Sequence, residues 1–120
     1  MQKKSVLIFD DEADICEICH LVLSDRYNVE TFNSIENLLI EIERVKPDLI
    51  LMDLVMAKIN DGERAIEILL KNSATKEIPL IVFSAIANGE KITQRLGATA
   101  FIEKPFNIAG LRETVARHIK

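Results

Sequence analysis

The sequence predicts an α/β fold in which helices cover both faces of a parallel sheet. Three short apolar runs support this prediction, because strands that are covered on both faces lack the alternation of half-exposed strands. Between the runs, apolar residues recur with a period of about 3.6 residues, which is typical of helices. Alternating strands and helices with short connections predict a doubly wound sheet with right-handed crossovers.

The predicted strands differ in how completely they are apolar. The three continuous apolar runs are residues 6–9, 49–52 and 80–83. Residues 29–32 alternate between apolar and polar side chains, and residues 99–102 form only a short segment. The continuous runs are therefore expected at the centre of the sheet and the other two strands at its edges.

Four helices are expected from clear apolar stripes. The stripes cover residues 15–23, 35–45, 66–70 and 108–119. Ser34 is predicted to cap the start of the second helix, and Pro47 to mark its end. Residues 88–96 leave room for a further helix of about two turns. The complete pattern is (βα)5, for which the flavodoxin-like strand order 2-1-3-4-5 is expected.

Length and composition narrow the class of protein. The 120 residues suit a single domain, so we expect one domain over residues 1–120 and no output domain in this chain. A hydrophobic content of 48% excludes a disordered chain, and a net charge of −4 argues against direct nucleic-acid binding. No apolar run approaches the roughly 20 residues that span a membrane. Residues 5–9 are too short for a signal-peptide core, so a cytoplasmic location is expected.

Polar side chains follow the strands at what would be one edge of the sheet. Asp10 and Asp11 follow the first run, Asp53 the second and Ser84 the third, and Lys104 comes just after the last strand. Three carboxylates in one place repel, by about 4 kcal/mol for a pair about 4 Å apart. Such a cluster needs protons or a cation, and its hard oxygen ligands suit Mg²⁺. The sequence therefore predicts a Mg²⁺ and phosphoryl site with a carboxylate nucleophile.

These segments resemble the receiver domain of two-component response regulators over nearly the whole chain. The matching segments are residues 7–12, 48–54, 61–62, 84–85, 97–98 and 101–106. The resemblance implies that Asp53 accepts a phosphoryl group from a histidine kinase or a histidine phosphotransfer protein. It also implies that Mg²⁺ is held by Asp10, Asp11, Asp53 and the backbone carbonyl of Val55.

The resemblance also implies which residues would transmit the effect of phosphorylation from the site to the protein surface. Ser84 would bond a phosphoryl oxygen, Lys104 would pair with it, and Phe101 would be the aromatic switch that follows Ser84. The peptide bond before Pro105 is often cis in this family. Such a domain is a signalling switch that assists only its own phosphorylation and dephosphorylation, so it is not an ordinary enzyme. Its expected partners are the kinase or phosphotransfer protein and an output domain or partner protein. The sequence leaves open whether it is a monomer or a homodimer.

Three alternative functions fit the sequence less well. A pseudo-receiver would act as an interaction module without phosphate, but the full set of site residues argues against it. A Mg²⁺-dependent phosphohydrolase usually has a second acid two residues after its nucleophile, where this chain has Val55. A flavodoxin-like electron carrier would need a phosphate-binding loop after the first strand, and this chain has acids there.

The chain departs from the family pattern near the site. Ala57 replaces the usual proline, and Asp61-Gly62 lies one residue further on, so a looser loop is expected at residues 58–60. The stretch from Ser84 to Gly97 is short, which favours a short fourth helix. Two apolar residues, Val55 and Ile86, occupy the positions that tune water access in the family. They predict slow self-dephosphorylation.

The string Cys16-Glu17-Ile18-Cys19-His20 matches the C-x-x-C-H pattern of haem attachment. It lies inside a predicted helix whose apolar stripe runs through Cys19, and buried thiols of this kind behave as small hydrophobes. Neither His20 nor His118 has a partner at metal-ligand spacing. We therefore predict that these residues pack the helix against the core and do not attach haem.

Overall fold

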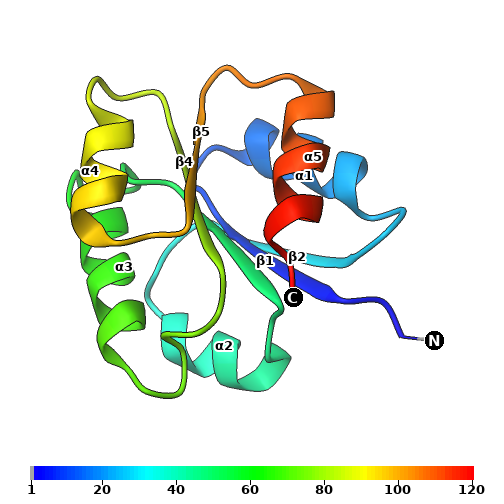
Figure 1. Cartoon of the computed structure of the whole chain (residues 1–120), viewed down its shortest axis with the longest axis horizontal. Helices are drawn as coiled ribbons and strands as arrows, with labels where there is room; N and C mark the ends of the chain where they lie inside the picture. Colours follow the sequence, from blue (N-terminus) through cyan, green and yellow to red (C-terminus); the bar gives the residue numbers. More distant parts are fainter. Residues whose placement is uncertain (1) are drawn as a thin grey trace.

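The five predicted strands form one parallel sheet in the computed structural model, which describes residues 2–120 (Figure 1). The strands are β1 (Ser5–Phe9), β2 (Asn28–Phe32), β3 (Leu49–Met52), β4 (Leu80–Ser84) and β5 (Ala100–Glu103). Their order in the sheet is β2-β1-β3-β4-β5, and all four neighbouring pairs are parallel. The predicted strand order and the predicted edge strands are confirmed.

Helices cover both faces of the sheet. They are α1 (Ala13–Leu23), α2 (Leu38–Val45), α3 (Asp61–Lys71), α4 (Gly89–Leu96) and α5 (Ile108–His118). In Figure 1, α1 and α5 lie on one side of the strands, and α2, α3 and α4 on the other. Two separate apolar clusters fill the spaces between the layers. No helix within residues 2–120 is long and apolar enough to cross a membrane.

The central strands are buried on both faces, as their continuous apolar composition predicts. Residues 6–9 of β1 and 49–52 of β3 are at most 1% exposed. Alternate side chains of a strand point to opposite faces, so each strand supplies both clusters. Leu7 packs in the cluster beneath α2 and α3, and Ile8 packs in the cluster beneath α1 and α5.

The start of the second helix differs from the prediction. We expected Ser34 as its N-cap, but α2 begins at Leu38 and Asn37 occupies the cap position. The hydroxyl of Ser34 instead accepts a hydrogen bond from the Glu36 N–H at 3.4 Å, and the Leu38 N–H donates to the Ile35 carbonyl. Ile35 still packs on the core, because this turn directs its side chain inward. An apolar stripe therefore does not distinguish a packed turn from the first turn of a helix.

The fourth helix is short, as predicted. It contains eight residues, from Gly89 to Leu96. Asn88 precedes it with a φ of 65°, and Gly97 ends it with a φ of 85°. The Gly97 N–H donates to carbonyls of the last turn, an arrangement that closes a helix with a left-handed residue.

Candidate functional site

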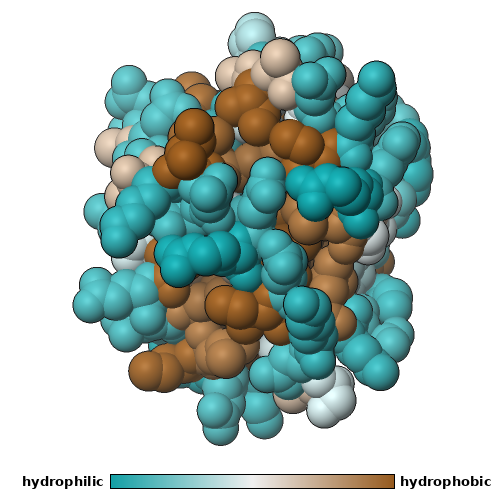
Figure 2. Space-filling view, turned by 90° about the vertical axis from the view of Figure 1, so that its left-hand side faces the viewer, coloured by the Kyte–Doolittle hydropathy of each residue, from teal (hydrophilic) through white to brown (hydrophobic). Residues whose placement is uncertain are grey.

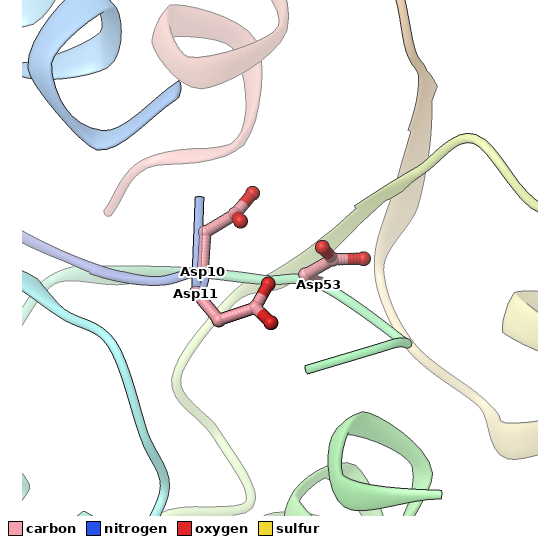
Figure 3. Close-up of side chains that lie close together, drawn as sticks. All are labelled: Asp10, Asp11 and Asp53. Carbon is pink, nitrogen blue, oxygen red and sulfur yellow. The ribbon is translucent and has the colours of Figure 1, made fainter. Parts of the chain in front are cut away.

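Three aspartates meet at the carboxyl edge of the sheet. Asp10 follows β1 and Asp53 follows β3, and the Asp53 N–H continues the pairing of these strands by donating to the Phe9 carbonyl at 3.0 Å. The carboxylates of Asp10, Asp11 and Asp53 surround one small space (Figure 3), and each offers an oxygen within 4.8 Å of the others. Asp10 and Asp53 are buried and Asp11 is exposed, so the cluster opens to solvent on one side.

Lys104 joins the two buried carboxylates. Its Nζ lies 2.6 Å from Asp10 Oδ2, 3.0 Å from Asp53 Oδ2 and 3.3 Å from Glu12 Oε1. The Lys104 side chain is only 8% exposed, and its ammonium lies 4.8 Å from the centroid of the Phe83 ring. Burial alone would lower the pKa of Lys104, but the hydrogen bonds to Asp10 and Asp53 raise this pKa above its ordinary value. The ammonium is therefore held charged between the carboxylates.

Local hydrogen bonds orient the two buried carboxylates. Asp10 Oδ1 accepts from the Glu12 N–H at 2.8 Å, and Asp53 Oδ1 accepts from the Val55 N–H at 3.2 Å. Burial raises the pKa of Asp10, and the contacts with Lys104 and the Glu12 N–H oppose this increase. Each carboxylate thus has one oxygen fixed by the backbone and the other directed at Lys104.

The loop after Asp53 turns tightly around Gly62. The Gly62 N–H donates to the Leu54 carbonyl, and a Cβ on Gly62 would lie 2.0 Å from the Asp53 carbonyl oxygen. The expected looser loop at residues 58–60 is closed by two hydrogen bonds between Lys58 and Asp61. The Arg64 guanidinium, 2.7 Å from Asp61, lowers the pKa of that carboxyl.

Ser84 ends β4 and Phe101 lies on the neighbouring β5, and neither belongs to the carboxylate cluster. Ser84 ends β4 and is buried, and its hydroxyl accepts a hydrogen bond from the Ile86 N–H at 3.4 Å. Phe101 is half-buried on β5, where it pairs with Val82 and faces Gly89 of α4. The Lys104 N–H donates to the Ser84 carbonyl, and the peptide bond from Lys104 to Pro105 is cis.

The residues present fit a divalent metal ion such as Mg²⁺. The three aspartates offer hard oxygen ligands, and one of the three is open to water, which Mg²⁺ usually keeps in its coordination shell. Lys104 balances only one of the three negative charges of Asp10, Asp11 and Asp53. The remaining negative charge favours a cation beside the carboxylates.

Mg²⁺ binding is expected to weaken as the pH falls from neutral into the acid range. Because burial raises the pKa of Asp10, protons compete for this carboxylate at a higher pH than for an ordinary aspartate. Calorimetric titration of the chain with MgCl₂ at several pH values measures the effect. The Asp10→Asn variant should lose most of the pH dependence. An affinity that stays constant over this range would contradict the prediction.

Two neighbours of Lys104 were not predicted from the sequence. Glu12 supplies a further carboxylate contact, and Phe83 places its ring beside the ammonium. The only sequence signals are that Glu12 adjoins the aspartate pair and that Phe83 immediately precedes Ser84.

The Cys16 to His20 string lies within α1 as predicted, where Cys19 is fully buried and its pKa is raised to about 12, mainly by burial.

Comparison with known proteins agrees with this geometry. Residues 6–116 match the family model described as response regulator receiver domain. The transcriptional regulatory protein KdpE of Staphylococcus aureus is 36% identical over 118 residues, which cover 96% of this chain and 49% of KdpE. The chain therefore spans about half the length of this curated relative.

Solved structures give the same result. The chemotaxis response regulator CheY4 of Vibrio cholerae superposes with a TM-score of 0.87 at 25% identity, over 98% of this chain and all of CheY4. NtrX from Brucella abortus superposes with a TM-score of 0.86 at 27% identity, over 98% of this chain but 27% of NtrX. With a matching family model over most of its length, and with the acidic cluster at the carboxyl edge of its sheet, the chain belongs to the response regulator receiver domain family of two-component systems.

Proposed function

We propose that this chain is a phospho-acceptor switch in which Asp53 receives a phosphoryl group from a phosphorylated histidine. The observation that carries the proposal is the position of the Asp53 carboxylate, which lies between Lys104 and the open, metal-fitting side of the cluster. An Asp53 oxygen would attack phosphorus as the phosphorus–nitrogen bond of the donor breaks, and the electron pair would stay on the imidazole. The product is an acyl phosphate.

The surrounding residues have distinct roles in this proposal. Asp10, Asp11, Asp53 and the Val55 carbonyl would hold Mg²⁺, which when bound neutralises phosphoryl oxygens. Lys104 already contacts Asp53 and would pair with an oxygen of the new group. It would do so by exchanging its carboxylate contacts for the phosphoryl contact.

Phosphorylation would move the switch through charge. The phosphoryl group adds about −1.5 to −2 charges and three acceptor oxygens. Ser84 would leave the Ile86 N–H to bond one of these oxygens, and Phe101 would follow it. Moving a two-state equilibrium from about 1:99 to about 99:1 requires about 5.5 kcal/mol. The charge-assisted hydrogen bonds of Ser84 and Lys104 to the phosphoryl oxygens would supply part of this free energy, less the contacts that Lys104 gives up.

The proposed partners are a histidine kinase or a histidine phosphotransfer protein. Two large apolar side chains are exposed on elements that follow site residues: Ile59, in the loop after β3, is 74% exposed, and Ile108, at the start of α5, is 53% exposed. On the side that carries α3 and α4, apolar patches alternate with polar rows (Figure 2).

The length of KdpE supports a further proposal, that this domain acts on an output domain or a separate partner protein. Family membership favours a cytoplasmic location. A homodimer of this domain is proposed as an alternative to its pairing with an output domain or a partner protein.

Incubation with acetyl phosphate tests the proposed chemistry. The intact mass of the wild-type chain is expected to increase by one phosphoryl group when Mg²⁺ is present, and to stay unchanged when the metal is chelated. The Asp53→Asn variant should show no increase, because its amide is not a nucleophile of this kind. Absence of uptake from both acetyl phosphate and a phosphorylated kinase would favour the pseudo-receiver instead.

The lifetime of the phosphoryl group is expected to be long and to depend on Val55. This half-buried apolar side chain follows Asp53 by two residues and offers no group that could orient an attacking water. We expect the Val55→Asn variant to lose its phosphoryl group about 3- to 10-fold faster, since an amide can position water for attack. Loss of the added mass after removal of acetyl phosphate measures this rate. An unchanged or slower rate in the variant would contradict the prediction.

A further inference from the structure

Phe101 rests on a glycine at the start of α4. A Cβ built on Gly89 would lie 2.8 Å from both Cε1 and Cζ of the Phe101 ring. Side-chain carbons do not approach a Cβ this closely, so the ring occupies space that exists only because residue 89 has no side chain. Gly89 is buried, and its own backbone is helical, so the glycine is not needed for a left-handed conformation.

Gly89 is also connected to Ser84 through a short turn. The Ser84 hydroxyl accepts the Ile86 N–H at 3.4 Å, and the Ile86 carbonyl accepts the Gly89 N–H at 3.2 Å. Two hydrogen bonds therefore join the Ser84 hydroxyl to the residue on which the ring lies. A movement of that hydroxyl would release one end of this turn.

The position of the ring on the sheet agrees with this connection. Phe101 pairs with Val82 across β4 and β5, and both side chains pack in the cluster between the sheet and the helices α2 and α3. Ser84 lies two residues after Val82 and therefore projects toward the same face. Phe101, Val82 and Ser84 therefore project toward the same face of the sheet, and on that face the ring lies against Gly89.

We infer that Gly89 is a positioning residue, which holds the Phe101 ring in its resting orientation and so sets the balance of the switch. This inference rests on the proposed function, in which Phe101 moves toward Ser84 after phosphorylation. Any side chain at position 89 would fill the space of the resting ring and favour the other orientation. A shift of the resting equilibrium toward that orientation makes phosphorylation faster, because less reorganisation remains.

The Gly89→Ala variant tests the inference. We expect it to take up phosphoryl from acetyl phosphate about 3- to 10-fold faster than the wild type. Alanine also strengthens a helix, so the same substitution is made in a Phe101→Leu background, which lacks the ring. In that background Gly89→Ala should change the rate by less than about 1.5-fold. Equal acceleration in both backgrounds, or none in the wild-type background, would overturn the inference.

A measurement without phosphate separates this inference from the proposed function. In the unphosphorylated wild-type chain, we expect nuclear Overhauser effects between the Phe101 ring protons and the Gly89 α-protons. Their absence would overturn the inference even if the Gly89→Ala variant failed to fold. Failure of the wild type to accept a phosphoryl group would instead refute the proposed function, whether or not these contacts were observed.

Discussion

Replacing Lys104 with methionine is expected to reduce the free energy of unfolding by about 3 kcal/mol or more in metal-free buffer. The ammonium contacts Asp10 at 2.6 Å and Asp53 at 3.0 Å, and both carboxylates are almost fully buried. Methionine fills a similar volume but leaves these two charges without their cation. Urea unfolding at neutral pH, with the metal chelated, measures the loss. The Lys91→Met variant, which removes an exposed lysine of α4, is the control and should stay close to the wild type.

The loss should depend on pH and on Mg²⁺. Without Lys104, the pKa of Asp10 rises further above its ordinary value of 3.8, since burial is no longer opposed by that cation. The folded variant then binds more protons than the unfolded chain between this ordinary value and the raised pKa, so its stability falls as the pH rises through that range. The deficit against the wild type should therefore shrink in acid. Mg²⁺ should stabilise the variant more than the wild type. A variant as stable as the wild type at neutral pH without metal would contradict this account of the site.

The Gly62→Ala substitution is expected to reduce the free energy of unfolding by about 3 kcal/mol or more and to impair phosphoryl uptake. A Cβ at this position would lie 2.0 Å from the Asp53 carbonyl oxygen and 2.4 Å from Leu54 Cα. Both atoms belong to the backbone that carries the acceptor, so relief of the clash must move Asp53 or the start of α3. Urea unfolding and the intact-mass assay measure the two effects.

A second glycine provides the matched control. Gly110 lies in α5, and a Cβ there would first meet Asn107 Oδ1 at 3.0 Å, at the end of a side chain that can rotate. Gly110→Ala should change the free energy of unfolding by less than about 1 kcal/mol, because the gain in helix propensity offsets the lost cap contact. Equal losses in the free energy of unfolding for the two substitutions would contradict the prediction, because the close approach at Gly62 would then add no cost of its own.

The sheet could be predicted from the sequence because apolar continuity reports burial directly. Strands 49–52 and 80–83 were expected at the centre, and their side chains are buried on both faces. The convergence of Asp10 and Asp53 then follows from topology, since parallel strands end at one edge. The predicted start of α2, with Ser34 as its N-cap, was wrong because the apolar Ile35 lies in a turn that also packs against the core.

Contacts made by long side chains could not be predicted in the same way. The sequence and the family resemblance placed Lys104 at the site, but not its simultaneous contacts with Asp10, Asp53 and Glu12. These depend on the path of the loop after β5 and on the rotamer of a flexible side chain. The close approaches at Gly62 and Gly89 were also missed, because a glycine in the sequence does not show which backbone or ring lies against it.

Mapping the phosphorylated residue tests the central proposal most directly. Borohydride reduces an aspartyl phosphate to homoserine, and peptide mass spectrometry then locates the altered residue. After incubation with acetyl phosphate and Mg²⁺, we predict homoserine at position 53 and at no other carboxylate. Homoserine at position 10 or 11, or phosphoryl uptake that persists in Asp53→Asn, would contradict the assignment of Asp53 as the acceptor.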